Sequence, residues 1–310
     1  MNILITGSSG QIGTNVALAL LARGDQVVGV DCRDNEWTDA FETMRLDLTK
    51  VGVVDLPGGP FDLVLHFAAH AKVYELVEHP ERAMENVTML FTVLDYCRQK
   101  GVPMVFSSSR EVYGDIHRHV TEEACADFVV AESPYSAGKM AGEAFIYSFC
   151  QCYGLPYLVF RFSNVYGRYD NDEQRMERVI PLFVKRIAHD QPLVVYGRDK
   201  VLDFTYVDDC VSGVLRGADA LVEGRVTNQT VNLAHGRGET LVDLVNIASL
   251  VLGKEPEVRY EPSRVGEVTR YVADISMARQ LLGYEPEVPL SAGLPRAIAW
   301  YRTTGALSGT

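Results

Sequence analysis

A glycine-rich stretch at residues 6–13 constrains the fold of this chain more than any other part of its sequence. It reads TGSSGQIG, follows the apolar run Asn2–Ile5 and leads into helical spacing of apolar residues over Gln11–Arg23. Glycines let such a turn be tight, and the N–H groups at the start of a helix attract phosphates. The stretch therefore predicts a strand, a turn and a helix that together hold the pyrophosphate of a dinucleotide.

An aspartate follows at the end of the second apolar run, Gln26–Val30. Asp31 lies near the spacing of roughly 20 residues after the glycines at which an acid binds the adenosine ribose. A carboxylate there accepts hydrogen bonds from the ribose hydroxyls and repels a 2′-phosphate, which favours NAD over NADP. Arg33 lies nearby, and its positive charge opposes the exclusion of a 2′-phosphate. The alternative interpretation of Asp31 is an aspartate in a plain turn at the end of a strand. We expect the cofactor to be NAD.

Apolar runs and helical patterns alternate through the first half of the chain. Further strand-like runs occupy Asp62–Phe67, Pro103–Ser107 and Tyr157–Arg161, and Arg82–Gln99 has helical spacing. This rhythm is typical of a parallel sheet that is covered by helices on both faces. The expected fold class is α/β, a Rossmann-type doubly wound parallel sheet with a smaller C-terminal substrate-binding α/β domain.

The second half of the chain is less regular, and no linker rich in Pro, Gly or Ser separates it from the first half. Four helical patterns follow one another there: Val179–Ala188, Thr240–Leu252, Ser276–Leu282 and Gly293–Tyr301. We expect residues 1–165, with parts of 195–235, to form the NAD-binding Rossmann domain. Residues 166–194 and 236–310 are expected to form the substrate-binding region.

The charge balance excludes one class of partner. The chain has 29 lysines and arginines against 41 aspartates and glutamates, a formal net charge of −12. So acidic a chain is a poor candidate for non-specific binding to nucleic acid. Its start lacks the basic end and apolar stretch of a signal peptide, and no run is long enough to span a membrane. We expect a cytoplasmic protein that binds neither nucleic acid nor membrane.

A metal site is not expected. The six cysteines are scattered, mostly in apolar runs, as is typical of reduced thiols in the cytosol. Cys150 and Cys152 are too closely spaced for the usual zinc pair, and no second pair follows. The His-Arg-His stretch at 117–119 lies in a polar segment, and we interpret it as part of a loop over the site rather than as a set of metal ligands.

A phenol and an amine are four residues apart at Tyr135 and Lys139, after a Ser133-Pro134 pair that suits the start of a helix. That spacing places both side chains on one helical face. A neighbouring ammonium and an oxidised nicotinamide would lower the pKa of the phenol from ~10, so that the phenolate could take a proton from a hydroxyl. A strand that ends at Ser109 adds a hydroxyl for the same substrate oxygen.

Motifs along nearly the whole chain resemble those of one family, and they occur in the family's order. After the glycine-rich stretch and Asp31 come His66-Phe67-Ala68-Ala69 and the segments FSSSREVYG at 106–114, SPYSAGK at 133–139, RFSNVYG at 161–167 and DFTYVDD at 203–209. Such an ordered series is far more specific than any single motif. The chain resembles the extended short-chain dehydrogenase/reductases, and within them the NAD-dependent epimerase/dehydratase family.

The resemblance implies roles for individual residues. It implies that Ser109, Tyr135 and Lys139 carry the chemistry. The residues implied to bind NAD are Gly7, Gly10, Gln11, Ile12, Gly13, Asp31, Asp47, Leu48, Phe67, Ala68, Ala69, Asn86, Ser107, Tyr135, Lys139 and Phe162. Those implied to contact the substrate are Ser109, Glu111, Asn164, Arg264 and Tyr271. For Arg264 the charge agrees, since a planar guanidinium suits a diphosphate, and a surface salt bridge is the alternative.

One departure from the family's pattern concerns the diphosphate. Many members have an arginine where this chain has Leu202, so one contact is either missing or supplied by another cation. The candidates for that substitute are Arg168, Arg198 and Lys200. Arg168 and Arg175 could equally meet a carboxylate on the sugar or lie in solvent.

A second departure follows the candidate catalytic serine. Arg110-Glu111 stands where the similar 4,6-dehydratases have an Asp-Glu pair and the similar nucleotide-sugar decarboxylases have a Ser-Glu pair. The chain thus keeps a candidate base for C5 of the sugar but lacks the dehydratase's acid. A structural pairing of Glu111 with a nearby arginine is the alternative interpretation.

We expect an NAD-dependent nucleotide-sugar epimerase, an isomerase of carbohydrate metabolism that inverts C4 of a UDP-hexose of the UDP-glucose/UDP-galactose type. Tyr135 would take the O4 proton as C4 gives up a hydride, and the 4-keto sugar would turn over before the hydride returns. The alternative is a nucleotide-sugar decarboxylase or 4,6-dehydratase that uses the same intermediate together with Glu111. A non-catalytic NAD-sensing protein is opposed by the intact Tyr135 and Lys139 pair.

Family analogy implies further properties. Helices over Glu81–Asn86 and Gly142–Phe149 correspond to a pair that commonly forms a dimer interface, so we expect a homodimer. Tyr271 corresponds to a position that lines the sugar pocket, where a bulky ring would disfavour an N-acetylated hexose. The sequence leaves the nucleotide base and the hexose open, and UDP is expected on family frequency alone.

Overall fold

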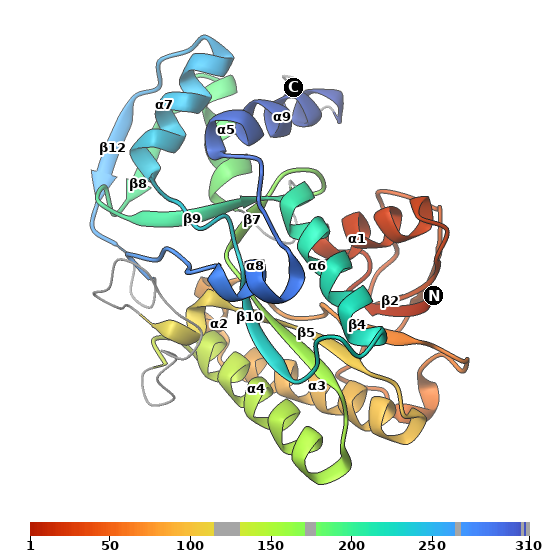
Figure 1. The fold of residues 1–310 in the computed structure, drawn as a ribbon. Helices are drawn as coiled ribbons and strands as arrows, with labels where there is room; N and C mark the ends of the chain where they lie inside the picture. Colours follow the sequence, from red (N-terminus) through yellow and green to blue (C-terminus); the bar gives the residue numbers. More distant parts are fainter. Residues whose placement is uncertain (115–130, 171–177, 264–267, 305–306, 308–310) are drawn as a thin grey trace.

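Seven parallel strands form the central sheet of the protein. The computed structural model describes residues 1–114, 131–170, 178–263, 268–304 and 307, and Figure 1 shows their fold. The strand order is β10-β6-β5-β4-β1-β2-β3. The bounds are β1 (Asn2–Thr6), β2 (Gln26–Asp31), β3 (Glu42–Arg45), β4 (Leu63–His66), β5 (Met104–Ser109), β6 (Tyr157–Phe162) and β10 (Gln229–Leu233). The order reverses between β1 and β4, so the sheet is doubly wound and the predicted α/β fold is confirmed.

Helices cover both faces of this sheet. Helices α1 and α6 pack together on one face, and α3 and α4 pack together on the other (Figure 1). These elements are α1 (Gln11–Ala22), α2 (Val73–Glu78), α3 (Glu81–Lys100), α4 (Pro134–Tyr153) and α6 (Val207–Val222), with the 3-10 turns η1 (Val53–Asp55) and η2 (Arg110–Tyr113). Side chains alternate along β1, so Ile3 and Ile5 enter the core shared with α1 and α6, whereas Leu4 enters the core shared with α3 and α4.

Helix α6 is not among the helices expected above, although its apolar residues recur at helical spacing; two glycines in its interior, Gly213 and Gly217, lower its intrinsic helical propensity. A Cβ at Gly213 would overlap the Leu233 side chain of β10, and a Cβ at Gly217 would overlap the Phe160 ring of β6. The two glycines therefore let α6 lie close against the sheet. The packing gained outweighs a propensity cost of ~1 kcal/mol for each glycine.

Most of the other C-terminal elements gather beside the sheet around α5, α7 and α9, whereas α8 packs against α6 and β10 (Figure 1). They form a three-stranded sheet in the order β11-β9-β7 and a parallel pair of β8 with β12. The bounds are β7 (Asn164–Tyr166), α5 (Val179–Ala188), β8 (Leu193–Tyr196), β9 (Val201–Tyr206), β11 (Gly238–Thr240), α7 (Leu241–Leu252), β12 (Val258–Glu261), α8 (Ser276–Leu282) and α9 (Leu290–Thr303). The four predicted helices of this half are confirmed, and the Thr240 side chain caps α7 by accepting the Asp243 N–H at 3.0 Å. The domain boundaries stay a prediction.

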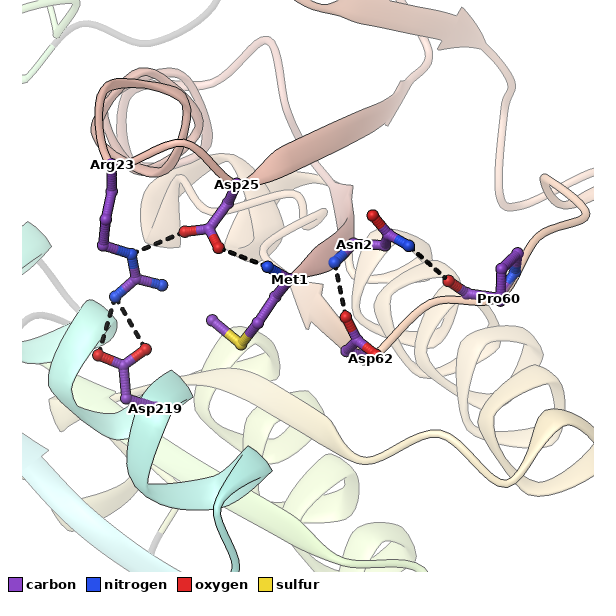
Figure 2. A network of polar contacts seen from close by, with 7 residues as sticks. All are labelled: Met1, Asn2, Arg23, Asp25, Pro60, Asp62 and Asp219. Atoms are coloured by element: carbon purple, nitrogen blue, oxygen red, sulfur yellow. Dashed lines mark hydrogen bonds and ion pairs between the residues drawn. The ribbon is translucent and has the colours of Figure 1, made fainter.

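A group of polar contacts ties the start of β1 to α1 and α6 (Figure 2). The Met1 ammonium and the Arg23 guanidinium each donate to Asp25 at 2.7 Å. Arg23 also donates from Nη1 to both carboxylate oxygens of Asp219 on α6, at 2.8 Å. Exposed ion pairs of this kind contribute only ~0–1 kcal/mol each, so apolar packing rather than these contacts holds α1 against α6.

Two kinds of feature are absent from the parts of the chain that the structure describes. Within those parts no helix combines the length and the apolar character needed to cross a membrane. Over the same residues no three side chains of His, Cys, Asp or Glu gather in a way that could hold a metal ion. The His-Arg-His stretch at 117–119 and Cys125 lie outside the described residues.

Candidate active site

Ser109, Tyr135 and Lys139 meet in one cavity of about 420 Å³, which all three help to line. Ser109 is the last residue of β5, and the other two lie one turn apart in α4. The Ser109 hydroxyl lies close enough to the Tyr135 phenol to lower its pKa. The Lys139 ammonium donates to the Ser107 carbonyl oxygen at 2.6 Å. The structure thus brings together the three residues predicted to be catalytic, at the carboxyl end of the sheet where an α/β fold binds its ligands.

The start of α4 sets the position of these side chains. The Ser133 oxygen accepts the Ser136 N–H at 3.2 Å, and the Ser136 hydroxyl oxygen accepts the Ser133 N–H at 3.0 Å. Pro134 opens the first turn, where its missing N–H costs no helical hydrogen bond. This reciprocal cap fixes the register of the helix, so that Tyr135 and Lys139 both face the cavity.

A buried polar network lies behind the serine strand. Glu143, one turn beyond the catalytic candidates in α4, accepts hydrogen bonds from Ser108 at 2.5 Å and from Arg161 at 2.6 Å. Arg161 also donates to the Tyr113 oxygen at 2.9 Å, and Tyr113 donates to Asn232 at 2.8 Å. The network joins α4 to β5, β6, η2 and β10. Ser108, Tyr113 and Arg161 lie in the motifs quoted above, but only the fold brings them together with Glu143 and Asn232.

Burial shifts the pKa of both titratable candidates in the cofactor-free protein. Loss of hydration lowers the pKa of Lys139 from 10.5 to about 8, against the attraction of Glu143. The same effect raises the pKa of Tyr135 from 10.0 to about 12, although its hydrogen bond with Ser109 acts in the opposite direction. The Lys139 ammonium lies 4.9 Å from the centre of the Phe106 ring and 5.7 Å from that of the Tyr135 ring. Because a positive charge beside the phenol would lower its pKa, an oxidised nicotinamide ring would activate it.

The glycine-rich loop lines the same cavity as these three residues, and its geometry suits a pyrophosphate. Gly7 has φ of +75°, and a Cβ there would lie 2.5 Å from the Ala68 nitrogen. A Cβ at Gly13 would overlap the Gly7 carbonyl oxygen. Gly10 caps α1 with no side-chain acceptor, so none of its own atoms competes with a phosphate for the first N–H groups of the helix. The residues present therefore fit NAD at this position.

Asp31 ends β2 beside this loop and is almost fully buried. Its carboxylate accepts the backbone N–H of Ser9 at 3.0 Å and that of Arg33 at 3.3 Å. A carboxylate has about four acceptor sites, so capacity remains for ribose hydroxyls. Asp47 carries an ion pair with Lys50 at 2.7 Å. The hydrogen bond from Lys50 is the main cause that lowers the pKa of Asp47 to about 2.

Most residues predicted to bind cofactor or substrate line the cavity. They are Gly7, Gly10, Gln11, Ile12, Gly13, Phe67, Ala69, Ser107, Ser109, Glu111, Tyr135, Lys139, Phe162 and Asn164. The remaining predicted residues that the structure describes are outside that lining: Asp31, Asp47, Leu48, Ala68, Asn86 and Tyr271. Asn86 instead holds the backbone of His70 through two hydrogen bonds, at 2.7 and 3.0 Å. Arg264 and Arg175 lie outside the described residues.

The substrate end of the cavity contains a set of linked polar side chains. Asn164, at the start of β7, accepts a hydrogen bond from Arg110 at 3.3 Å and donates one to the Asp203 carbonyl oxygen at 3.1 Å. The Arg110 guanidinium carbon lies 5.7 Å from the centre of the Tyr271 ring. Tyr271 is buried and stacked on Tyr113, with ring centres 5.9 Å apart. Tyr271 thus supports Arg110, and its contact with a sugar stays a prediction.

Arg178 is a cation of the cavity that the sequence motifs do not indicate. It precedes the first residue of α5, lines the cavity and donates to the side-chain oxygen of Gln11 in the glycine-rich loop. Three cations were suggested above to replace the arginine that this chain lacks at position 202. None of them is among the described residues that line the cavity: Arg168, Arg198 and Lys200. Arg168 pairs instead with Asp208 at 2.6 Å. The sequence signal for Arg178 is its place directly before a strongly amphipathic helix, and that signal is weak.

Comparison with known proteins identifies the class. The model of the NAD dependent epimerase/dehydratase family matches residues 3–234. The match covers most of the chain, including the glycine-rich loop and the Ser109, Tyr135 and Lys139 group. The chain therefore belongs to this family, and the predicted resemblance is confirmed.

Individual relatives match nearly the whole length of the chain. UDP-glucuronate 4-epimerase 1 of Arabidopsis thaliana is 29% identical over 333 residues, which cover 97% of this chain and 76% of that protein. UDP-glucose 4-epimerase of Thermotoga maritima, solved with UDP-glucose, has a TM-score of 0.90 at 28% identity. The match covers 98% of this chain and 99% of that chain. UDP-glucose 4-epimerase of Thermus thermophilus, solved with NAD, has a TM-score of 0.85 at 29% identity, with coverage of 97% and 99%.

Proposed function

We propose that this chain is an NAD-dependent nucleotide-sugar 4-epimerase, which inverts C4 of a UDP-hexose of the UDP-glucose/UDP-galactose type through a 4-keto intermediate. The observation that carries the proposal is the single cavity that joins the glycine-rich loop to Ser109, Tyr135 and Lys139. The similarity in sequence and fold to 4-epimerases of UDP-sugars supports the choice of reaction.

Tyr135 is the group placed to move a proton at O4 of the sugar. Bound NAD supplies the chemistry of taking a hydride from C4 and returning it. Lys139 favours the phenolate through its positive charge, and its hydrogen bond to the Ser107 carbonyl fixes the ammonium beside β5. Ser109, whose hydroxyl lies beside the phenol, is placed to orient the same sugar oxygen. Because Tyr135 returns the proton to O4 at the end, the residues finish in the state in which they began.

The diphosphate of the substrate needs positive charge, and we assign Arg178 to it. A planar guanidinium presents several donors in a geometry that suits a phosphate. Arg178 lines the cavity between the glycine-rich loop and α5, so it supplies charge that the Leu202 position lacks. Asn164 lies in the same lining and stays the second predicted contact. Arg264 stays a predicted contact outside the described residues.

A decarboxylase or a 4,6-dehydratase is the second candidate function, because Glu111 lines the cavity and is almost fully buried. Both reactions use the same 4-keto intermediate and need a further group that moves a proton at a neighbouring carbon. Glu111 is, however, ion-paired with Arg110 at 2.9 Å. Residue 110 is also a positively charged arginine, at the position where the similar 4,6-dehydratases have an acidic residue. Epimerisation therefore fits these two residues better.

We further propose that the protein is a cytoplasmic homodimer in which α3 and α4 form the interface. Large apolar side chains on these two helices are exposed: Met84, Phe91, Phe145, Tyr147 and Tyr153. Phe91 of α3 packs edge-on against Phe145 of α4, with ring centres 5.9 Å apart, so the exposed apolar surface is continuous across both helices. Light scattering should give a dimer for the wild type and a monomer for Phe91→Lys. A monomeric wild type at micromolar concentration would contradict the proposal.

A labelling experiment tests the proposed reaction. UDP-glucose, UDP-galactose and UDP-glucuronate are each incubated with the enzyme in deuterium oxide, and the products are analysed by NMR and mass spectrometry. Epimerisation should interconvert two sugars with no solvent deuterium bound to carbon. Loss of water with deuterium at C5 would instead reveal a dehydratase, and release of carbon dioxide from UDP-glucuronate would reveal a decarboxylase.

A further inference from the structure

The cavity that contains the candidate catalytic residues also contains a carboxylate. Glu111 lines the same cavity as Ser109 and Tyr135. Its backbone N–H donates to the Ser109 hydroxyl at 3.2 Å, so its position is tied to that of the candidate catalytic serine. A carbonyl at C4 makes the C–H bonds at C3 and C5 acidic. A base in the same cavity could remove a proton that epimerisation must leave in place.

Arg110 is ion-paired with one oxygen of the Glu111 carboxylate. Its Nη2 lies 2.9 Å from Glu111 Oε1, and the two side chains are only 12% and 6% exposed. The guanidinium is itself held in place, because Nη2 also donates to Asn164 and the charge lies over the face of Tyr271. In such a buried place an ion pair is little weakened by solvent. The pair is therefore a fixed part of the cavity wall rather than a surface contact.

We propose that Arg110 determines the fate of the keto sugar by holding Glu111 out of proton transfer. This inference rests on the proposed epimerase function, because it is the 4-keto intermediate that has the acidic C–H bonds. A carboxylate held against a guanidinium is stabilised in its ionised form, so it resists taking up a proton. In addition, Oε1 of Glu111 is directed at Arg110. Epimerisation then proceeds with the bonds from C3 and C5 to hydrogen intact.

The reaction that Arg110 suppresses can be written in full. The Glu111 carboxylate takes the proton from C3 or C5, and the electron pair of that C–H bond forms a double bond to C4. The π pair of the carbonyl moves to O4, which gives an enolate. Return of a proton from the Glu111 carboxylic acid to the same carbon restores the ketone. In deuterium oxide the acid exchanges its proton with solvent, so the carbon regains deuterium, and no further reactant is consumed.

The substitution Arg110→Met tests this role, since it keeps the length of the side chain and removes its charge. Each protein is incubated with UDP-glucose in deuterium oxide, and NMR measures deuterium at C3 and C5 relative to epimerised product. We expect this ratio to rise at least about tenfold above that of the wild type, which is below the ~10²–10⁴-fold contribution of a well-placed general base. The ratio for Arg110→Lys, which keeps the charge, should be closer to that of the wild type than the ratio for Arg110→Met.

The double variant Arg110→Met/Glu111→Gln identifies the base, and its ratio should return to that of the wild type. Carbon exchange that persists in the double variant would overturn the inference. An unchanged ratio in an Arg110→Met enzyme that still epimerises would overturn it too. The ratio is internal to each sample, so partial unfolding lowers both rates and leaves it unaltered.

Further outcomes distinguish a variant that fails to fold from a failure of the proposed function. If Arg110→Met does not fold, Arg110→Gln replaces it, with the same rise expected and the same unchanged ratio counting against the inference. A wild type that epimerises no UDP-sugar would refute the proposed function itself. A wild type that epimerises while the variants show no exchange would refute the role of Arg110 alone.

Discussion

The two ends of the cavity are built in different ways. At the cofactor end, the glycine-rich loop and Asp31 come from one continuous unit of β1, α1 and β2. At the substrate end, Arg110 comes from η2, Asn164 from β7 and Arg178 from the residue before α5, and these places are distant in sequence. A continuous unit can be recognised from the spacing of its residues. A site that packing assembles from separate elements leaves only isolated residues in the sequence.

The two ends also differ in the groups that they offer to a ligand. The cofactor end relies on backbone, since Gly10 begins α1 without a side-chain cap and Gly13 packs directly on Gly7. The substrate end relies on charged side chains, with Arg178 placed toward a ligand and Arg110 paired with Glu111 in the cavity wall. Changes of shape should therefore damage the cofactor end, and changes of charge should damage the substrate end. Lys139 lies where the two ends meet, so it provides the strongest test.

Replacement of Lys139 by methionine should have the largest effect. Loss of the ammonium removes the charge that favours the Tyr135 phenolate, so kcat should fall by ~10²–10⁴-fold, the range of a general acid–base group. The measurement is the initial rate of conversion of UDP-glucose, with bound NAD determined in the same sample. A variant that retains NAD and loses less than about threefold in kcat would contradict the assignment.

The same substitution should raise the stability of the cofactor-free protein. Because burial lowers the pKa of Lys139 to about 8 from 10.5, the cofactor-free native state binds fewer protons than the unfolded state between those pH values. The penalty is complete below about pH 8 and disappears as pH rises to 10.5. Thermal unfolding of cofactor-free protein should therefore show Lys139→Met gaining most over the wild type near pH 7. A gain that does not shrink toward pH 10.5 would be inconsistent with this sign.

Gly13→Ala should damage the cofactor end next most strongly. Its Cβ would overlap the Gly7 carbonyl oxygen, which is backbone and cannot move aside as a side chain could. Overpacking of this kind costs ~1–3 kcal/mol of stability, and NAD should be lost on gel filtration. Gly24→Ala is the comparison for an added methyl group, since a Cβ there meets no atom within 4 Å, although its φ of +93° adds local strain. Full NAD retention by Gly13→Ala would show that the loop is more adaptable than we infer.

Arg178→Leu should have a smaller and more selective effect at the substrate end. Loss of one charged hydrogen-bonding group to a phosphate costs ~1.5–3 kcal/mol, so KM for UDP-glucose should rise by about tenfold or more, with a lesser change in kcat. Arg168→Leu is the matched control, because Arg168 pairs with Asp208 outside the cavity lining. Equal effects of the two substitutions on KM would remove the reason for assigning Arg178 to the diphosphate.

Arg23→Ala should have the smallest effect, because it changes neither end of the cavity. The substitution breaks the exposed contacts to Asp25 and Asp219 that Figure 2 shows. We expect a loss of less than about 1 kcal/mol in the free energy of unfolding and unaltered kinetics. Urea unfolding with a kinetic assay measures both. A change in KM as large as that of Arg178→Leu would mean that the link from α1 to α6 acts on the site.

The sequence predicted those parts of the structure whose signals are local. The glycine-rich turn, the placing of Tyr135 and Lys139 one turn apart, and the Ser133-Pro134 start of α4 each depend on a few consecutive residues. Helix α6 was missed although its apolar residues recur at helical spacing, and the place of Gly213 and Gly217 within it is explained only by their contact with the sheet. Propensity is a weak guide wherever tertiary packing decides the outcome.

The substrate end shows the same limit at the level of function. Glu111 and Asn164 were predicted and lie in the cavity lining, but the ion pair of Glu111 with Arg110 was only one of two alternatives until the structure placed both side chains. Arg178 was not predicted. Nothing in the order of residues along the chain indicates that α5 begins against Gln11 of the glycine-rich loop.

The most direct test of the central claim is the rate of UDP-glucose and UDP-galactose interconversion by Tyr135→Phe, measured beside the wild type with bound NAD quantified in both. The variant lacks the phenolic oxygen that takes the O4 proton, yet it keeps the ring that packs in α4. The account predicts a fall in kcat of ~10²–10⁴-fold with NAD retained. Turnover by Tyr135→Phe at the wild-type rate would contradict it.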